Sequence, residues 1–324
     1  MNKPSSRRKG TNVLVTGGAG FIGSHVVRRL LRSGREATVI DDLSTGRKEN
    51  LPSKAKLTVK SVLSASKQDV LGYDEVIHCA AQVSTFLSVD RPADDFRRNA
   101  ESTFHLFELL RKYNDDARVV FTSSRSVLGE ISGDGAADEG YPVNPTAIYA
   151  VHKAYGEMLC RSYAGLYGMK FTVLRPSNVY GPGQPYWVGG WYDFISYWIK
   201  LALEKAPIPI YGDGNQVRDY TYIGDISAAF ELALKEPRAI GETFLLTSGE
   251  GINLLELARI INRLTRNRAG VKFLPARKGD LKRFVGDSRK AKKILGWTCK
   301  VPLVTGLNQE VGWVRSEIGL SPQH

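Results

Sequence analysis

The chain has 324 residues, of which 42% are hydrophobic, so it can bury the core of one large domain or two smaller ones. Its three cysteines form no CxxC pair, which argues against a disulfide framework and a metal site, and no apolar run is long enough to span a membrane. The net charge is +12, but the basic residues are scattered and no ribonucleoprotein or zinc-finger pattern occurs, so we expect a soluble, cytoplasmic protein with no nucleic-acid or membrane partner.

Short runs rich in β-branched residues recur along the chain, and helical patterns separate most of them. The predicted strands are residues 12–16, 37–41, 56–59, 75–80, 118–123, 171–175 and 243–247. Helical patterns occupy residues 24–34, 102–113 and 147–164. Continuous apolar strands that alternate with helices predict an α/β fold, in which a doubly wound parallel (Rossmann) sheet is covered on both faces.

The amino-acid composition changes after residue 176. Residues 182–194 are rich in glycine, proline and aromatic residues, and residues 205–225 are rich in turn formers, which is typical of a smaller lobe that closes over a pocket. We therefore predict a basic flexible tail (1–10), a Rossmann domain (11–176, with 220–248 returning to it) and a C-terminal substrate-binding lobe (177–219 and 249–324).

The stretch "VTGGAGFIG" places Gly17, Gly20 and Gly23 between the first predicted strand and the helix that follows it. Glycine allows the tight turn and lets a pyrophosphate approach backbone N–H groups at the positive end of the helix. The second strand ends in Asp41, whose carboxylate can accept hydrogen bonds from ribose hydroxyls and repels a 2′-phosphate. The pattern predicts an NAD site.

The stretch "YAVHK" places Tyr149 and Lys153 four residues apart on a predicted helix, so both side chains lie on one face. A free tyrosine is a poor base at neutral pH, but a nearby ammonium group favours its phenolate. Together with the glycine turn, this pair predicts a redox site with Tyr149 as the base.

These motifs make the chain resemble the extended short-chain dehydrogenase/reductase family, and within it the nucleotide-sugar epimerases and dehydratases. The resemblance extends from about residue 12 to about residue 315. It is carried by "TGGAGFIGSH", "DDLSTG", "VIHCAAQ", "RRNAEST", "FTSSRSVLG", "YAVHK", "RPSNVYGPG", "YGDGNQVRDYTYIGD", "ARKGD" and "KKILGW". It implies a homodimer that pairs helices near residues 100–113 and 148–164.

The resemblance also implies roles for individual residues. The catalytic residues are Ser124, Tyr149 and Lys153. The residues implied to bind NAD are Gly17, Gly20, Phe21, Ile22, Gly23, Asp41, Asp42, Ser44, Thr45, Ala80, Ala81, Asn99, Tyr149 and Lys153. Those implied to bind a nucleotide sugar, expected to be UDP-linked, are Ser124, Ser126, Asn178, Arg218, Tyr220, Arg277 and Phe284.

The two residues after Ser124 bear on the reaction. Dehydratases of this family carry Asp-Glu there for acid–base work, whereas this chain has Arg125 and Ser126. This favours a 4-epimerase of the UDP-glucose/UDP-galactose type, and the bulky Phe284 disfavours N-acetylhexosamines. The alternatives are a uronate 4-epimerase or decarboxylase, a 4,6-dehydratase, a CDP-sugar 2-epimerase and a non-catalytic NAD-binding regulatory protein. His152 replaces the small residue usual in Tyr-x-x-Ser-Lys, and we interpret it as structural.

Overall fold

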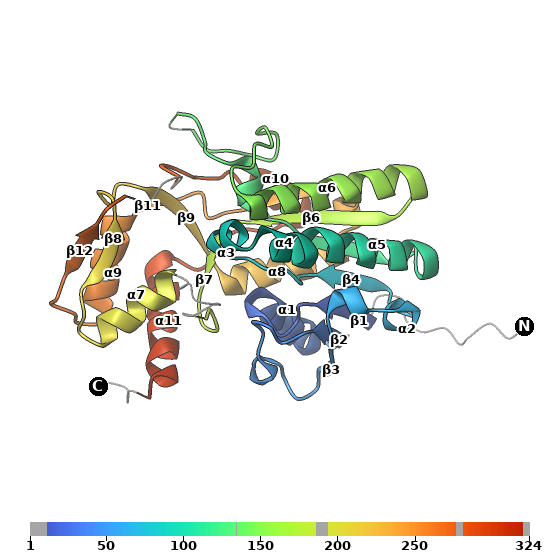
Figure 1. The fold of residues 1–324 in the computed structure, drawn as a ribbon, viewed down its shortest axis with the longest axis horizontal. Helices are drawn as coiled ribbons and strands as arrows, with labels where there is room; N and C mark the ends of the chain where they lie inside the picture. Colours follow the sequence, from blue (N-terminus) through green and yellow to red (C-terminus); the bar gives the residue numbers. More distant parts are fainter. Residues whose placement is uncertain (1–11, 134, 186–193, 277–280, 320–324) are drawn as a thin grey trace, which may run out of the picture.

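The computed structural model describes residues 12–133, 135–185, 194–276 and 281–319. Within these residues, seven strands form one parallel sheet in the order β10-β6-β5-β4-β1-β2-β3 (Figure 1). They are β1 (Asn12–Thr16), β2 (Glu36–Asp41), β3 (Lys56–Val59), β4 (Glu75–His78), β5 (Arg118–Thr122), β6 (Lys170–Pro176) and β10 (Thr243–Leu246). The predicted strands coincide with these to within two residues at each end, and the predicted doubly wound fold is confirmed.

Alternation along the strands explains how both faces are covered. In β1, Val13 and Val15 belong to the core beneath α1 (Phe21–Arg32) and α8 (Ile223–Lys235), whereas Leu14 belongs to the opposite core. That second core packs under α5 (Ser102–Tyr113) and α6 (Ile148–Tyr167), which lie in front of the sheet in Figure 1. The central strands β1, β4 and β5 are therefore buried along most of their length, as their largely apolar sequences indicate.

The chain between β4 and α5 is helical but irregular. It contains α3 (Thr85–Asp90), α4 (Pro92–Asp95) and a π-helix, η3 (Phe96–Glu101), that leads directly into α5. Other short helices are α2 (Lys67–Val70) and the 3₁₀ helices η1 (Lys48–Asn50), η2 (Val62–Ser64), η4 (Arg125–Leu128) and η5 (Pro237–Ala239). Single-turn π segments are rare and often lie at functional sites.

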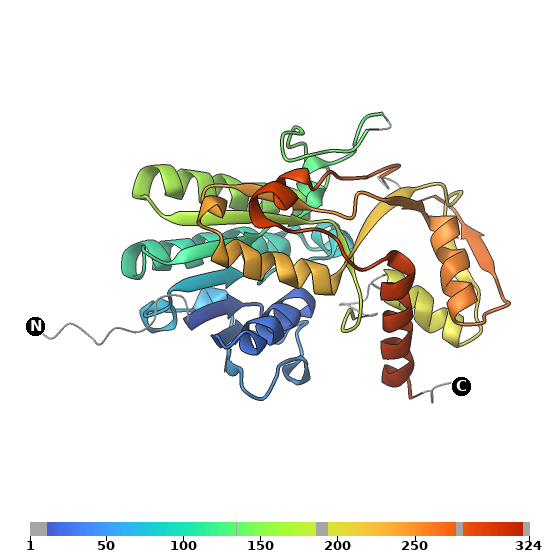
Figure 2. The same ribbon diagram turned by 180° about the vertical axis from the view of Figure 1, so that it is seen from behind.

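A second body lies beside the carboxyl ends of the strands (Figures 1 and 2). It has its own apolar core beneath α7 (Phe194–Leu203), α9 (Leu254–Leu264) and α11 (Leu303–Glu317). Its strands are β7 (Asn178–Tyr180), β8 (Ile208–Tyr211), β9 (Val217–Tyr222), β11 (Gly251–Asn253) and β12 (Val271–Leu274). One helix of the predicted lobe range, α10 (Arg289–Leu295), instead packs against β10 and α8. No described helix is both long and apolar enough to cross a membrane.

Candidate active site

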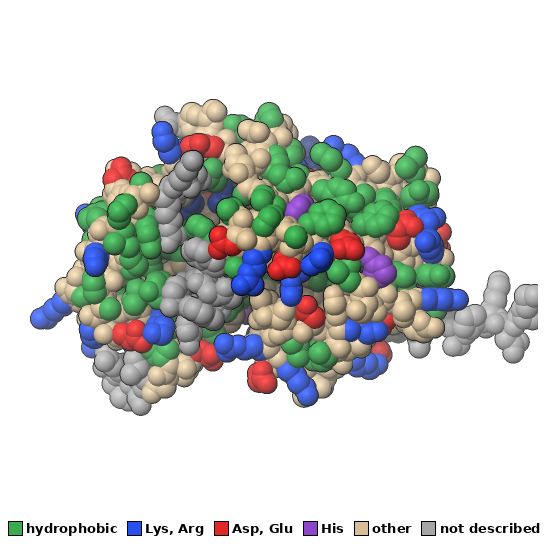
Figure 3. Space-filling model, viewed as in Figure 1, with side chains coloured by type: hydrophobic (Ala, Val, Ile, Leu, Met, Phe, Trp, Pro, Cys, Tyr) green, Lys and Arg blue, Asp and Glu red, His purple; other side chains and the backbone are tan. Residues whose placement is uncertain are grey.

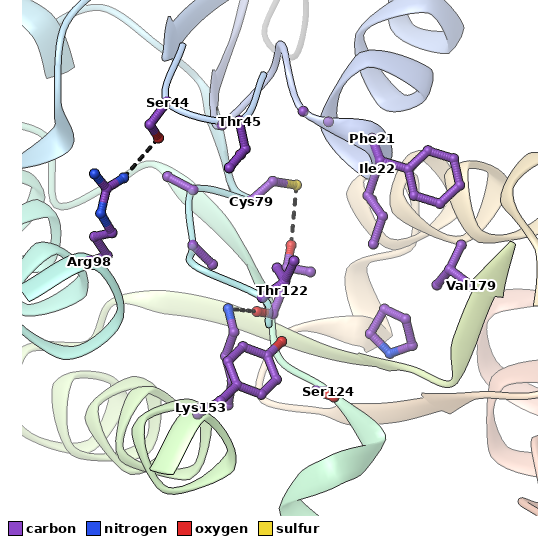
Figure 4. Close-up of a pocket in the computed structure, with 18 of the residues that line it drawn as sticks. Phe21, Ile22, Ser44, Thr45, Cys79, Arg98, Thr122, Ser124, Lys153 and Val179 are labelled. Carbon is purple, nitrogen blue, oxygen red and sulfur yellow. Dashed lines mark hydrogen bonds between the residues drawn. The ribbon is translucent and has the colours of Figure 1, made fainter. Parts of the chain in front are cut away.

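A cavity of about 670 Å³ opens where the carboxyl ends of the parallel strands meet the second body (Figure 4). Parallel α/β sheets bind their ligands at this edge. The predicted site residues that line it are Gly17, Gly20, Phe21, Ile22, Gly23, Asp41, Asp42, Ser44, Thr45, Ala80, Ala81, Ser124, Ser126, Tyr149, Lys153, Asn178 and Tyr220. Among the described residues, Asn99, Arg218 and Phe284 do not line this cavity, and Arg277 lies outside the described residues.

The glycine turn leaves no room for side chains. Gly17 has φ +68°, and a Cβ atom built on it would lie 2.5 Å from the backbone nitrogen of Ala80. A Cβ atom on Gly23 would lie 2.1 Å from the carbonyl oxygen of Gly17. The turn therefore brings bare backbone to the cavity where α1 begins, as a bound pyrophosphate requires.

Asp41 is held in place by backbone groups. Its Oδ2 accepts a hydrogen bond from the backbone N–H of Ala19 at 2.9 Å, and its Oδ1 accepts one from Leu43 at 2.8 Å. Burial raises the pKa of this carboxyl group, and these hydrogen bonds partly offset the rise. The result is a fixed carboxylate beside the glycine turn, an acceptor that fits the ribose hydroxyls of NAD.

The predicted catalytic residues meet at the inner end of the cavity. Lys153 donates from Nζ to the carbonyl oxygen of Thr122 at 2.8 Å (Figure 4). Its Nζ lies 5.9 Å from the centre of the Tyr149 ring. Burial lowers the pKa of Lys153 to about 8. Burial also raises the pKa of Tyr149, whereas a hydrogen bond with Ser124 and the charge of Arg125 lower it. The structure thus brings these three residues together, with Arg125 beside them.

A buried ion pair supports this arrangement from behind. Glu157, one turn after Lys153 on α6, accepts hydrogen bonds from Nε and an Nη atom of Arg175 at 2.8 and 2.6 Å. It also accepts one from the Ser123 hydroxyl at 2.5 Å. Ser123 is therefore a buried strand-end residue, and the ion pair ties α6 to the ends of β5 and β6.

Asn99 and His152 share a second network, centred on the fully buried Asp95. Asn99 donates to Asp95 and exchanges two hydrogen bonds with the backbone of Gln82, and His152 bonds through Nδ1 to the other Asp95 oxygen. The network fixes the segment after Ala81, which lines the cavity. It supports a structural interpretation of His152, and it places Asn99 behind the cavity wall.

Arg125, which follows Ser124, lies on the cavity wall. One of its Nη atoms donates to Oδ1 of Asn178 at 3.3 Å, and its guanidinium carbon lies 4.8 Å from the centre of the Phe284 ring. Phe284 itself is fully buried. The side chain that meets the cavity here is therefore the arginine, with Phe284 behind it, and the effect of Phe284 on substrate choice stays a prediction.

Sequence reasoning missed several side chains that line the cavity, among them Cys79, Thr122 and Arg98. Cys79 contacts the Thr122 hydroxyl through its sulfur at 3.2 Å (Figure 4). Arg98 directly precedes Asn99 in "RRNAEST". This position could have indicated that Arg98 lies near the cavity, but we assigned a role only to the asparagine of the motif. Within the described residues, no cluster of three or more His, Cys, Asp or Glu side chains could hold a metal ion.

Comparison with known proteins shows which family the chain resembles. The model of the NAD-dependent epimerase/dehydratase family matches residues 13–246, more than half of the chain. A UDP-glucose 4-epimerase of Mycolicibacterium smegmatis is 34% identical over 316 residues, which cover 94% of this chain and 98% of the relative.

Two solved structures match almost the whole chain. The UDP-glucose 4-epimerase of Thermotoga maritima, solved with UDP-glucose, matches with a TM-score of 0.89 at 34% identity, over 95% of this chain and 99% of its own. The UDP-glucuronic acid 4-epimerase of Bacillus cereus, solved with UDP-glucuronic acid and NAD, matches with a TM-score of 0.87 at 30% identity, over 94% and 99%.

Proposed function

The chain belongs to the NAD-dependent epimerase/dehydratase family, and on this premise we propose that it is a nucleotide-sugar 4-epimerase that interconverts UDP-glucose and UDP-galactose. The observation that carries the proposal is the cavity wall at residues 124–126. Ser124 lies beside Tyr149 and Lys153, and the two positions after it hold Arg125 and Ser126. The described wall thus supplies a base for one hydroxyl but lacks the acid–base pair that dehydration needs at these positions.

In the proposed reaction, bound NAD would supply the hydride acceptor for the sugar carbon and would give the hydride back. Tyr149 removes the proton of the sugar hydroxyl. Ser124, which is hydrogen-bonded to Tyr149, orients that hydroxyl. The positive charges of Lys153 and Arg125 favour the phenolate against the cost of burial. Asp41 orients the cofactor through its ribose, and the glycine turn holds the pyrophosphate.

A second candidate is a uronate 4-epimerase, and one observation favours it. The guanidinium of Arg125 lies at the cavity wall next to Asn178, where it could bind a sugar carboxylate. The proposed 4-epimerisation is the same for both substrates, so only the group on C6 differs.

Product NMR over a panel of UDP-, CDP- and dTDP-sugars, including UDP-glucuronate, tests both candidates. Purified protein should form the C4 epimer of UDP-glucose without added NAD, because the cofactor is regenerated in each cycle. If UDP-glucuronate is the only sugar of the panel that is converted to its C4 epimer, the protein is a uronate 4-epimerase, the second candidate. Unchanged sugars throughout the panel would contradict both and favour a non-catalytic NAD-binding protein. Tyr149→Phe should lose turnover by orders of magnitude while NAD stays bound, and wild-type activity would reject Tyr149 as the base.

We also propose that the protein is a cytoplasmic homodimer. Its three cysteines are free thiols, which supports a reducing compartment. Figure 3 shows hydrophobic side chains gathered over α5 and α6. Exposed apolar residues on η3, α5 and α6 include Phe96 (51% exposed), Phe104 (45%), Met158 (59%) and Leu166 (73%). A patch of this kind is costly on a monomer and typical of a subunit interface.

Phe104→Asp tests the dimer, because a charge in the centre of an apolar interface should dissociate it. Light scattering coupled to gel filtration should report a dimer for the wild type and a monomer for the variant. Phe273→Asp is a matched control, since Phe273 is also exposed (54%) but lies on β12. A monomeric wild type would reject the proposed dimer.

A further inference from the structure

Arg98 lies on one side of the cavity, where it contacts the loop after β2. It lies on η3, in the helical segment that follows β4, and it lines the cavity. One of its Nη atoms donates to Oγ of Ser44 at 2.8 Å and lies 3.3 Å from Oδ2 of Asp42. Ser44 and Asp42 belong to the loop after β2, so Arg98 joins two segments that are more than 50 residues apart. Figure 4 shows Arg98 and Ser44 on the side of the cavity opposite Phe21 and Ile22.

The contact between Arg98 and Asp42 is an exposed one. The side chains of Arg98 and Asp42 are 45% and 37% exposed, and an ion pair at such a site is weak. Asp42 also has another partner, because its Oδ1 accepts hydrogen bonds from the backbone N–H and the hydroxyl of Ser44. Arg98 can therefore leave Asp42 at low cost, and the loop after β2 keeps its own hydrogen bonds.

A dinucleotide in this cavity brings two negative charges on its pyrophosphate. The glycine turn offers backbone N–H groups to them from one wall. The described lysine and arginine residues that line the cavity are Lys60, Arg97, Arg98, Arg125 and Lys153. Lys60 is held by both oxygens of Asp69 at 3.0 Å, and Lys153 is buried against the carbonyl of Thr122.

The two remaining arginines lie elsewhere on the wall or have other partners. Arg125 bonds to Asn178 and lies beside Ser124, at the end of the cavity where the sugar reacts. Arg97 is 64% exposed and lies 3.6 Å from Asp94 on its own helical segment. Of these five residues, Arg98 is the one that bonds to the loop after β2, on the side of the cavity opposite Phe21 and Ile22 at the start of α1 (Figure 4).

We propose that Arg98 is a latch over the cofactor: it bridges to Asp42 and Ser44 in the structure described here, and it moves to the pyrophosphate when NAD binds. A guanidinium suits this role because it can offer two N–H donors to phosphate oxygens at once. The inference rests on the proposed NAD-dependent function and adds a cofactor-binding residue to it. It also gives η3 a role, since this π-helix presents Arg98 to the cavity and Asn99 to the network behind it.

Ligand affinities test the latch without measuring catalysis. The dissociation constants of NAD, ADP and adenosine should be measured by titration calorimetry or competition, after removal of any retained NAD, for the full-length protein and its Arg98→Ala and Arg98→Lys variants. Arg98→Ala should weaken NAD and ADP about ten-fold at low salt, because charge-assisted hydrogen bonds to the pyrophosphate are lost, and should leave adenosine unchanged. Arg98→Lys should recover part of the affinity. Arg289→Ala, which removes an exposed arginine paired with Asp287, should change none of the three.

Three results of these measurements would contradict either the proposed role of Arg98 or the proposed function. Equal weakening of NAD and adenosine would mean that Arg98 acts only by holding the loop after β2, and it would overturn the latch. NAD affinity within two-fold of the wild type in Arg98→Ala would overturn it as well. A wild-type protein that neither retains NAD on purification nor binds added NAD would instead contradict the proposed function, so the two failures are distinguishable.

Discussion

Glu157→Gln should lower the free energy of unfolding by about 3 to 5 kcal/mol, the usual cost of removing one partner from a buried ion pair. The side chains of Glu157 and Arg175 are only 3% and 2% exposed, and three hydrogen bonds converge on the carboxylate. One Nη atom of Arg175 has no hydrogen-bond partner within the described residues even in the wild type. Glutamine would keep the shape but leave a buried guanidinium without its counter-charge.

Thermal and urea unfolding followed by circular dichroism measure this loss. For 324 residues the entropy of unfolding is about 0.7 kcal/mol per kelvin, so the melting temperature should fall by about 4 to 7 °C. Asp116→Asn is the exposed control, since Asp116 pairs with Lys170 at the surface, and it should leave the melting temperature unchanged.

A double variant separates charge from packing. Glu157→Leu combined with Arg175→Met replaces the pair by apolar groups and should recover most of the lost stability, because no unpaired charge is buried. A Glu157→Gln variant within 1 kcal/mol of the wild type would refute the reasoning. A double variant no better than the single one would show that the ion pair stabilises by geometry and not by charge compensation.

Two further predictions concern the catalytic lysine and the glycine turn. Burial lowers the pKa of Lys153 from 10.5 to about 8, so between these values the unfolded chain binds more protons and the contribution of this group to stability rises with pH. The stability of the wild type relative to Lys153→Met, from urea unfolding, should therefore increase by about 2.5 kcal/mol between pH 7 and pH 10, and a constant difference would contradict the burial of a charged lysine. Gly23→Ala should abolish NAD binding in calorimetry, because the new Cβ atom would lie 2.1 Å from the Gly17 oxygen. Gly165→Ala on α6, where a Cβ atom meets nothing within 4 Å, should retain NAD and gain about 0.5 to 1 kcal/mol, and equal losses in both variants would argue against the tight turn.

Local patterns predicted the sheet and part of the cavity well. Strands such as residues 12–16 are continuous and apolar because both of their faces are buried, and the glycine turn and Asp41 lie at fixed distances along the chain from these strands. The resemblance also singled out Ser124, and the structure places it beside Tyr149, while its catalytic role stays a prediction. Spacing within one segment was enough for these features.

Contacts between distant segments were beyond this reasoning. The bridge from Arg98 to Ser44, the bond from His152 to Asp95 and the position of Phe284 behind Arg125 each join residues more than 50 positions apart. They depend on how side chains pack after the sheet has formed, and no periodicity in the sequence records that packing. Asn99 shows the difference, because its motif was recognisable but its place behind the cavity wall was not.

The environment of Cys79 determines how readily oxidants and alkylating reagents modify a side chain of the cavity wall. Oxidants and alkylating reagents attack the thiolate of cysteine and react poorly with the neutral thiol. Burial raises the pKa of Cys79 to about 11, so at neutral pH its sulfur is almost entirely protonated while it contacts the Thr122 hydroxyl. The sulfur at the wall beneath the reacting groups should therefore stay reduced during oxidative stress, and labelling of the intact protein with iodoacetamide should spare it.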